Sequence, residues 1–475
     1  MDATARLENS HREILYPQVE GRLIERPFVC APPRKVKRTI RWAFYLLIFS
    51  FPFEMPKLGL PLEVTTFTGS LFLLTTLLQP SICFRRPPRV FWWFGVYLYV
   101  YTCVSLFYIS AHPAEVVKLL FLLVQLILLC WTGSNLMREE RNARIALLSL
   151  ITGCTVLALF QLLGIARSAI EVDSYVQRFT VLGQNPNNLA RMFSMGLLAL
   201  VGLTFGRKRR ALQPGFIVYP LFALMLFALA DTGSRGSFLA LGVGLLAVMS
   251  GGNTFWQKFR NMFGALLAIS FCIWVSYQSE AMRVRFVSTI DEGSMAKREV
   301  IFPAAWQLFL DSPLIGWGPV NNTWELGSRM GEPDHPSRDT HNLGLELLTA
   351  TGILGAIPFF IGICFCVCLA WKARAGTQGV LPFAMIAAII ISNVGANMLH
   401  SKLLWFVLSY ALASGGQLVS RRFRPMIVGA GLRPLRASVE GSQQKDAPLY
   451  FRPWCPRGSG PLITRVARPR IRTNE

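Results

Sequence analysis

The tetrapeptide Asp339-Thr340-His341-Asn342 ends a long polar segment, residues 279–342, and opens the apolar run LGLELLTATGILGAIPFFIGICFCVCLAW at residues 343–371. An apolar helix of about 20 residues crosses the hydrocarbon core of a bilayer, so this run is long enough to span a membrane. The polar segment carries six Lys/Arg and nine Asp/Glu, a balance of −3 in a chain of formal charge +22. This boundary predicts a large loop on one face of a membrane protein, with a histidine at its base.

The composition of the whole chain indicates many membrane spans. Of its 475 residues, 52% are hydrophobic and 16% are charged, and the mean hydropathy is +0.42. These values are too apolar for an ordinary soluble domain. Apolar runs separated by polar turns predict an all-α polytopic membrane protein of about twelve transmembrane helices. The expected spans lie near residues 41–53, 62–78, 90–109, 116–132, 145–165, 188–205, 216–230, 237–249, 262–277, 343–371, 380–392 and 403–418.

Basic clusters between the apolar runs predict the orientation of the chain in the membrane. They lie at residues 34–38, 85–86, 138–144, 207–210, 258–260, 372–374 and 421–422. The twelve-span pattern puts all of them on one side. Because Lys and Arg favour the cytoplasmic side, both ends of the chain are expected inside and residues 279–342 outside. The basic residues are therefore assigned to topology and membrane lipids, and nucleic acid is not expected as a partner.

The span pattern divides the chain into five parts. Residues 1–40 form a basic cytoplasmic tail, and residues 41–278 form the first nine spans. Residues 279–342 form the large outside loop, and residues 343–420 form the last three spans. Residues 421–475 are rich in Pro, Gly and Arg, which predicts a disordered cytoplasmic tail.

A glycine-flanked arginine between two expected spans is the first candidate site. In Asp231-Thr232-Gly233-Ser234-Arg235-Gly236-Ser237, the glycines allow the backbone to approach a ligand closely. The Arg235 guanidinium offers a planar fork that matches phosphate oxygens. The alternative is a plain tight turn whose arginine reaches the membrane interface. The spacing favours neither interpretation.

Two further arginines lie on either side of the turn signal Asn185-Pro186. The following residues Asn187 and Asn188 suit the N-cap of a helix, and this structural interpretation is favoured for the asparagines. Arg178 precedes the turn, and Arg191 lies one turn into an apolar helix. A charge at that depth is costly and is usually paired or functional.

Short amphipathic helices are expected in the large loop. Apolar residues recur at helical spacing after Lys297-Arg298-Glu299, so a helix here could lie flat on the membrane with Arg298 near the headgroups. Pro303 suits the first turn of a helix, and the helix is expected to begin there. The alternative is that the loop only caps the helical bundle.

His341 is the candidate catalytic residue. A histidine with a pKa near neutrality can take a proton from a hydroxyl group. It follows Asp339, lies three residues after Arg338, and opens an apolar run, although a lone histidine is more often structural. The chain has no phosphate-binding glycine loop with lysine, no nucleophile elbow and no His-Glu-x-x-His motif. It also lacks an Asp-x-Asp pair that could hold a divalent metal for a nucleotide sugar, so the donor of a glycosyl transfer would be lipid-linked.

These residues resemble a signature of the O-antigen ligase and polymerase superfamily. The resemblance includes Thr232-Gly233-Ser234-Arg235-Gly236 before an apolar span and the Gly183-x-x-Pro186-Asn187 segment. A longer block consists of Arg298, Trp306, Ser312-Pro313-Leu314-Ile315-Gly316-Trp317-Gly318, His341-Asn342, Glu346, Gly352 and Gly355. The resemblance covers residues 178–355, whereas the N-terminal spans agree only in being apolar.

The resemblance implies a multi-spanning enzyme similar to GT-C-type glycosyltransferases, in the bacterial inner membrane. Such enzymes take a glycan from undecaprenyl pyrophosphate at the periplasmic face and pass it to lipid A core, to a growing polysaccharide or to a protein. Arg235 and Arg298 would bind the donor pyrophosphate, with Arg178 and Arg191 as weaker candidates. His341 would activate the acceptor hydroxyl. No metal and no other cofactor is expected, because fixed arginines stabilise the charge of a leaving pyrophosphate.

Three functions stay open at this point. The first is an O-antigen ligase or polymerase in lipopolysaccharide or exopolysaccharide synthesis. The second is a protein O-oligosaccharyltransferase of the same superfamily, and the third is a flippase or transporter of lipid-linked glycans. A transporter is expected to carry ionisable residues at mid-depth in several spans. Here the arginines and His341 lie at the outer ends of the spans, which favours chemistry at the membrane surface.

Overall fold

Helices make up most of the described part of the chain. The computed structural model describes residues 35–54, 63–85, 87–173, 176–205, 215–249, 251, 254–291, 297–331 and 337–422. Most of the two expected tails, 1–40 and 421–475, lies outside these residues, as does the basic cluster 207–210. The division of the chain into five parts stays a prediction.

A helix occupies each of the twelve segments that were expected to span the membrane. They are α1 (Arg38–Ser50) with the 3-10 helix η1 (Phe51–Phe53), α2 (Val64–Thr76), α4 (Val90–Phe107), α5 (Pro113–Leu136), α6 (Glu140–Leu162), α7 (Pro186–Phe205), α8 (Gly215–Asp231), α9 (Arg235–Met249), α10 (Phe255–Gln278), α14 (Leu343–Ala373), α15 (Leu381–Val394) and α16 (Lys402–Arg422). A short helix, α3 (Pro80–Cys83), follows α2. Among the described residues, α4, α5, α6, α10 and α14 are long and apolar enough to cross a membrane. A mostly helical membrane protein is thus confirmed, whereas the number of twelve spans stays a prediction.

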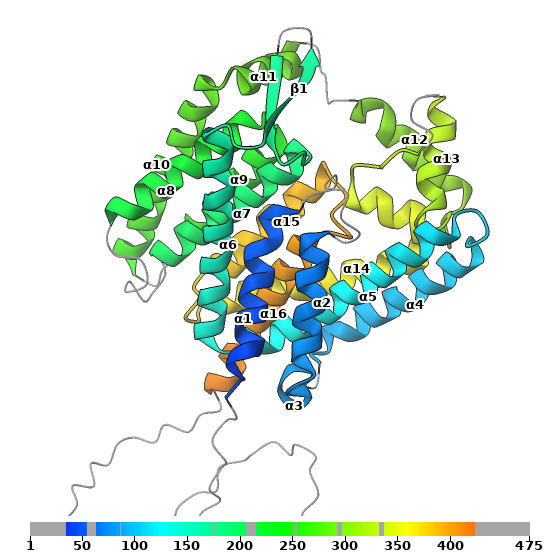
Figure 1. Cartoon of the computed structure of the whole chain (residues 1–475), viewed down its shortest axis with the longest axis horizontal. Helices are drawn as coiled ribbons and strands as arrows, with labels where there is room; N and C mark the ends of the chain where they lie inside the picture. Colours follow the sequence, from blue (N-terminus) through cyan, green and yellow to red (C-terminus); the bar gives the residue numbers. More distant parts are fainter. Residues whose placement is uncertain are drawn as a thin grey trace, which may run out of the picture. The chain divides into compact units, whose positions relative to one another are not determined.

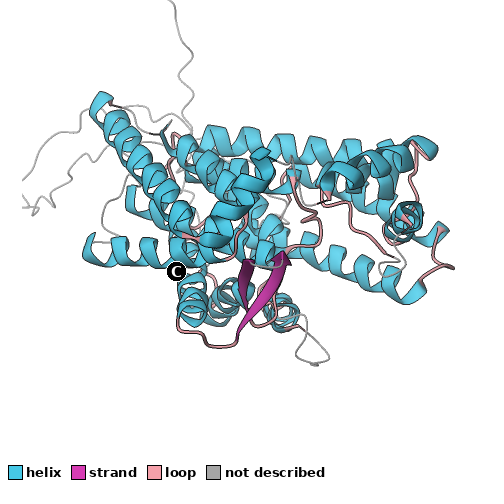
Figure 2. Cartoon of the chain, turned by 90° about the horizontal axis from the view of Figure 1, so that it is seen from above, coloured by secondary structure: helices cyan, strands magenta, loops and turns pink. Residues whose placement is uncertain are grey.

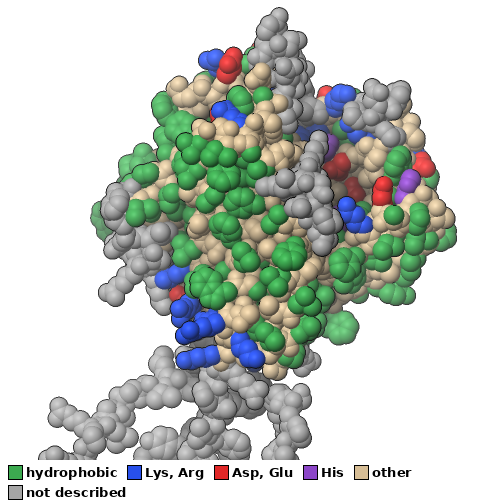
Figure 3. Space-filling view, in the orientation of Figure 1, with side chains coloured by type: hydrophobic (Ala, Val, Ile, Leu, Met, Phe, Trp, Pro, Cys, Tyr) green, Lys and Arg blue, Asp and Glu red, His purple; other side chains and the backbone are tan. Residues whose placement is uncertain are grey.

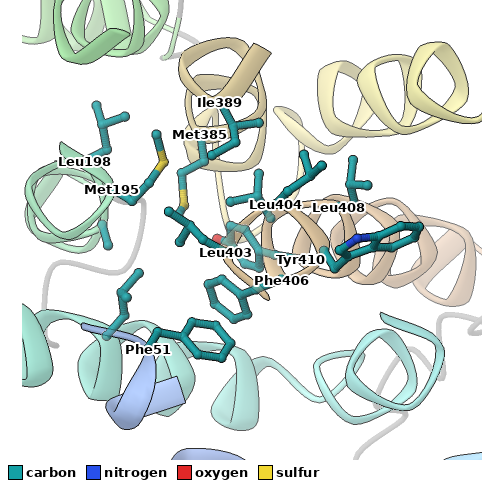
Figure 4. Close-up of a cluster of buried hydrophobic side chains, with 14 of the residues drawn as sticks. Phe51, Met195, Leu198, Met385, Ile389, Leu403, Leu404, Phe406, Leu408 and Tyr410 are labelled. Carbon is teal, nitrogen blue, oxygen red and sulfur yellow. The ribbon is translucent and has the colours of Figure 1, made fainter. Parts of the chain in front are cut away.

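The buried core joins helices that are far apart in the sequence. α14 packs against α4 and α16, and α15 packs against α9 (Figure 1). Met195 and Leu198 of α7 lie near Met385 of α15, with side chains of η1 and α16 beside them (Figure 4). Glycines permit this packing: a Cβ added at Gly202 would lie 2.4 Å from Leu381. Small residues allow helix backbones to approach closely where lipid supplies no hydrophobic driving force between helices.

A two-stranded antiparallel hairpin interrupts the helical pattern and was not expected. β1 (Arg167–Asp173) pairs with β2 (Val176–Val181), with Arg167 opposite Val181, on one side of the helices (Figure 2). Val176-Gln177-Arg178-Phe179-Thr180-Val181 is rich in β-branched and aromatic residues, which favour strands. The Arg167 guanidinium lies 3.4 Å from the centre of the Phe179 ring and 3.1 Å from the Asp231 carboxylate. These contacts fix the hairpin against the end of α8.

The described residues of the polar segment 279–342 form three helices, α11 (Glu280–Asp291), α12 (Arg298–Asp311) and α13 (Asn321–Met330). α12 and α13 share a small apolar core of Ile301, Ala305, Leu308 and Leu326. The prediction that the α12 helix begins at Pro303 is wrong, because the helix begins at Arg298 and contains the proline. A proline lacks its own N–H and crowds the carbonyl four residues earlier. Here that carbonyl belongs to Glu299, in the first turn of the helix, so the rest of α12 is unaffected.

α14 is broken at Gly352, whose backbone has φ 59° and ψ −165°. The break releases backbone groups, and the segment 312–318 binds them. The N–H groups of Trp317 and Gly318 donate to the carbonyls of Thr349 and Ala350 at 2.7 and 3.0 Å. The N–H groups of Ile353 and Leu354 donate to the carbonyls of Pro313 and Leu314 at 2.8 and 3.2 Å. Backbone groups that leave a helix at membrane depth must find such partners within the protein.

Basic side chains gather at one end of the helical unit. The exposed Lys37 and Arg38 begin α1, and Figure 3 shows Lys and Arg side chains around that end. Such a ring is expected where helices emerge on the cytoplasmic side. The face on which residues 279–342 lie in the cell stays a prediction.

Candidate functional site

Three of the four predicted arginines line one open pocket. Arg191 of α7, Arg235 of α9 and Arg298 of α12 surround about 430 Å³ of empty space. Arg285 of α11 and Ser392 of α15 complete this arginine pocket. The residues come from five helices and span two hundred positions of the sequence, so only the fold brings them together. A pocket that gathers several guanidinium groups suits a ligand with several negative oxygens.

Arg178, the fourth predicted arginine, lies behind the pocket and supports its wall. Its side chain is buried. Its Nε donates to the carbonyl of Thr232 at 2.8 Å, and its Nη2 donates to Asn187 Oδ1 at 2.9 Å. Burial, together with the positive charges of Arg235 and Arg298, lowers the pKa of Arg178 to about 10. The guanidinium remains charged at neutral pH and adds to the positive potential of the site.

The turn before α9 presents a helix N-terminus to the pocket. Gly233 has φ 63°, a left-handed conformation that glycine adopts without strain. α9 begins at Arg235, and Ser234, Gly236 and Ser237 all line the pocket. The N-terminus of a helix carries a partial positive charge and favours an anion. The spacing in the sequence favoured neither a plain tight turn nor a phosphate site, and the phosphate site stays a prediction.

Arg285 was missed by the sequence interpretation, and it is bound directly to Arg235. Arg235 Nη1 donates to the carbonyl of Arg285 at 2.6 Å. Arg285 Nη1 donates to the carbonyl of Gly233 at 2.6 Å. The two arginines therefore fix each other's position at the pocket wall. No motif surrounds Arg285 in the sequence; the only signal was its place in the large loop as one of six basic residues.

Arg298 connects the pocket to the segment that carries His341. Its Nη2 donates to the carbonyl of Gly395 at 2.8 Å, and Asn342 Nδ2 donates to the adjacent carbonyl of Val394 at 3.0 Å. The buried Nε of Arg298 and the buried Oγ of Ser392 have no hydrogen-bond partner among the described residues. Buried polar groups of this kind usually have partners. Two such groups belong to side chains that line the pocket.

His341 lies in a strained turn beside the arginines, although it is not among the lining residues of the pocket. It has φ 51°, an unfavourable value for a residue with a side chain. Asp339 stabilises the turn: its Oδ1 accepts the N–H of His341 at 3.1 Å, and its Oδ2 lies 3.6 Å from His341 Nδ1. A carboxylate near Nδ1 favours the tautomer that leaves Nε2 unprotonated.

The surroundings of His341 keep its imidazole neutral. Burial lowers its pKa below the usual 6.5; Asp339 opposes this, and Arg298, Arg338 and Arg191 add to it. An imidazole that is neutral at pH 7 can act as a base. Two of these arginines, Arg298 and Arg191, line the pocket and place His341 within its electrostatic field.

Asparagines cap both α7 and α14, but the cap of α7 is not the asparagine that the sequence predicted. Asn342 caps α14, because its Oδ1 accepts the N–H of Leu345 at 3.0 Å. α7 is instead capped by Asn185, whose Oδ1 accepts the N–H of Asn187 at 2.9 Å. Asn187 binds Arg178, and Asn188 Oδ1 accepts from Arg191 Nη1 at 2.9 Å. The predicted caps are thus wrong because both side chains hold arginines.

Residues 220–360 match the family model described as O-antigen ligase. Over this region the chain is similar to O-antigen ligases. The resemblance to the O-antigen ligase and polymerase superfamily is therefore confirmed. Comparison with curated proteins gives no match.

The matched region contains most of the site. Its limits, in α8 and α14, enclose Arg235, Arg285, Arg298 and His341. Arg178 and Arg191 precede the matched residues and reach the site through the hairpin and α7. Ser392 follows the matched residues, and the sequence offered only one signal for it, a Ser-Asn pair near the end of an apolar run.

Proposed function

We propose that this O-antigen ligase-like protein transfers a glycan from undecaprenyl pyrophosphate to an acceptor hydroxyl at the periplasmic face of the bacterial inner membrane. The acceptor is lipid A core or a growing polysaccharide. The observation that carries the proposal is the convergence of Arg191, Arg235, Arg285 and Arg298 on one pocket beside His341. A pyrophosphate has enough oxygens to engage several guanidinium groups at once.

In the proposed reaction, the acceptor hydroxyl attacks the anomeric carbon of the donor glycan. The new bond joins the acceptor oxygen to that carbon, and the bond from the carbon to the pyrophosphate oxygen breaks. His341 Nε2 takes the hydroxyl proton, while Asp339 stabilises the imidazolium that forms. One direct displacement inverts the configuration at the anomeric carbon.

The arginine pocket lowers the barrier by stabilising the leaving group. Undecaprenyl pyrophosphate gains one negative charge as its bond to the sugar breaks. Guanidinium groups that are already fixed, as Arg235 and Arg285 are by their mutual contacts, need no reorganisation when this charge develops. We propose that they take the place that a divalent metal holds in other glycosyltransferases, with no metal or cofactor required.

Donor binding by variants of α11 tests the proposal. Arg283 and Arg285 lie two residues apart on α11, but only Arg285 lines the pocket. We expect Arg285→Ala to weaken the binding of a synthetic undecaprenyl-pyrophosphate oligosaccharide in nanodiscs and Arg283→Ala to leave it unchanged. Equal binding by both variants and the original chain would contradict a pyrophosphate site here.

Two alternative functions differ from this proposal in what becomes of the donor glycan. A protein O-oligosaccharyltransferase of the same superfamily would label a protein from the same pool of donor. A flippase would move the lipid-linked glycan across the bilayer without releasing undecaprenyl pyrophosphate. The position of His341 in an electropositive turn at the mouth of α14 favours transfer chemistry, because translocation needs no base there.

A further inference from the structure

A buried polar cluster lies directly beneath the His341 turn. Glu346 of α14 is 3% exposed, and Thr340, Asn322 and Thr349 are fully buried. Glu346 Oε1 accepts from Asn322 Nδ2 at 3.2 Å, and Glu346 Oε2 lies 3.0 Å from Thr340 Oγ1. The cluster links α13, the turn 339–342 and α14. Glu346 appears in the sequence resemblance without a role, and the mechanism above does not use it.

The hydrogen atoms available to Thr340 indicate the protonation state of Glu346. Thr340 Oγ1 lies within hydrogen-bond distance of two oxygens, the Glu346 carboxyl at 3.0 Å and the carbonyl of Asn342 at 3.1 Å. A hydroxyl has one proton to donate, and a carbonyl oxygen can only accept. If Glu346 carries a proton, it donates to Thr340 and Thr340 donates to Asn342, so both contacts are hydrogen bonds.

The surroundings of Glu346 agree with a neutral acid. Among the described residues, no Lys, Arg or His forms an ion pair with this side chain; its two partners are an amide and a hydroxyl. A buried carboxylate without a cation is costly, whereas a buried carboxylic acid with both oxygens bonded is not.

We propose that Glu346 is a neutral carboxylic acid that donates a hydrogen bond to Thr340, and that this bond positions His341 for the transfer reaction. Thr340 precedes His341 in the chain, and Asn342 follows it. The Thr340 hydroxyl binds the carbonyl oxygen of Asn342. The buried side chain of Thr340, which Glu346 holds in place, therefore fixes the strained backbone on both sides of His341. Glu346 is a positioning residue, and this inference rests on the role proposed for His341.

Two isosteric threonine substitutions separate positioning from general stability. Thr340→Val removes the hydroxyl between Glu346 and Asn342. Thr349→Val removes an equally buried hydroxyl of the same cluster, which accepts from Asn322 at 3.1 Å on the side away from the turn. We expect Thr340→Val to lower kcat about 10-fold, the effect of one lost hydrogen bond, with little change in the KM for donor. Thr349→Val is expected to keep the original kcat.

The protonation state is tested at Glu346 itself. Glu346→Gln keeps one acceptor for Asn322 and supplies an N–H for Thr340, so we expect kcat within about 2-fold of the original chain. Glu346→Ala removes both bonds and is expected to lower kcat at least 10-fold. Release of undecaprenyl pyrophosphate from a synthetic lipid-linked oligosaccharide, with the source membrane lipids as acceptor, gives kcat and KM per inserted molecule.

The outcomes are distinct. Equal kcat for Thr340→Val and Thr349→Val would overturn the positioning role. A loss in Glu346→Gln as large as that in Glu346→Ala would show that the carboxylate charge is needed, and would overturn the neutral acid. A lower membrane abundance with unchanged kcat would show a purely structural cluster and overturn the inference. No release by the original chain would instead contradict the proposed function.

Discussion

Arg235 and Arg285 hold each other by reciprocal hydrogen bonds to the backbone. Each guanidinium donates to a carbonyl in or beside the other's segment, both at 2.6 Å. Both side chains also line the arginine pocket. A rigid pair of this kind suits an anion whose charge increases during the reaction.

Arg285→Ala is expected to weaken donor binding 10-fold or more, since hydrogen bonds to charged groups contribute about 1.5–3 kcal/mol. The KM for the lipid-linked donor should rise while the amount of inserted protein stays close to that of Arg283→Ala. Quantitative donor titration with protein in nanodiscs measures the effect. An unchanged KM would assign Arg285 to the support of the Gly233 turn alone.

Lysine should replace Arg235 and Arg298 poorly. Lysine keeps the charge but has a single ammonium group in place of the planar fork, and the Arg298 Nη2 bond to Gly395 depends on that fork. We expect Arg235→Lys and Arg298→Lys to retain insertion and to lose more than about 10-fold in kcat/KM. Normal turnover in both lysine variants would identify these arginines as membrane-interface anchors.

His341→Ala should lower the transfer rate by roughly 10²–10⁴, the effect of a lost general base, without loss of donor binding. The pH dependence of the transfer rate gives a second test of His341 as the base. The pKa of His341 lies below 6.5, and the base acts when neutral, so the rate should be constant from neutral pH down to about 6.5 and fall only at lower pH. Full turnover per molecule in the alanine variant would remove His341 from the mechanism.

The orientation of the protein is testable by cysteine labelling. Ser328 on α13 and Lys372 near the end of α14 are both exposed. We expect Ser328→Cys to react with a membrane-impermeant maleimide in intact spheroplasts and Lys372→Cys to react only after permeabilisation. The original chain, whose Cys103, Cys364 and Cys368 are exposed, supplies the background. The reverse pattern would invert the topology.

Much of the fold follows from hydropathy, but the site follows only in part. Apolar runs between polar turns predict each of the twelve helices, because a long stretch of apolar residues is a strong local signal. The hairpin was missed because two strands of seven and six residues between two long helices give a weak signal. Arg235, Arg298, Arg191 and Arg178 were found because charge or glycine stands out in apolar sequence. Arg285 and Ser392 were not found, because their relation to the pocket depends on long-range packing that leaves no local pattern.

The glycine at the break in α14 should tolerate no side chain. A Cβ at Gly352 would lie 2.2 Å from the carbonyl oxygen of Leu314, and its φ of 59° is unfavourable for other residues. We expect Gly352→Ala to destabilise the protein by more than about 2 kcal/mol. Gly242 of α9 has no atom within 4 Å of an added Cβ, so Gly242→Ala should be neutral or stabilising by about 0.5–1 kcal/mol. Thermal unfolding in detergent compares the two, and equal stability would contradict the close approach at Gly352.

The contact between residues 312–318 and α14 has a consequence for how this region can vary. Its four hydrogen bonds join backbone to backbone, so they do not depend on the side chains of Leu314 and Ile315. These two side chains are 62% and 37% exposed. Those two positions are free to adapt to a different lipid or glycan surface. The shape of the contact is instead set by Gly316 and Gly352, where an added Cβ would lie 2.6 and 2.2 Å from main-chain oxygens. Substitutions at Leu314 and Ile315 can therefore change the surface that residues 312–318 present, while the backbone contact between this segment and α14 stays in place.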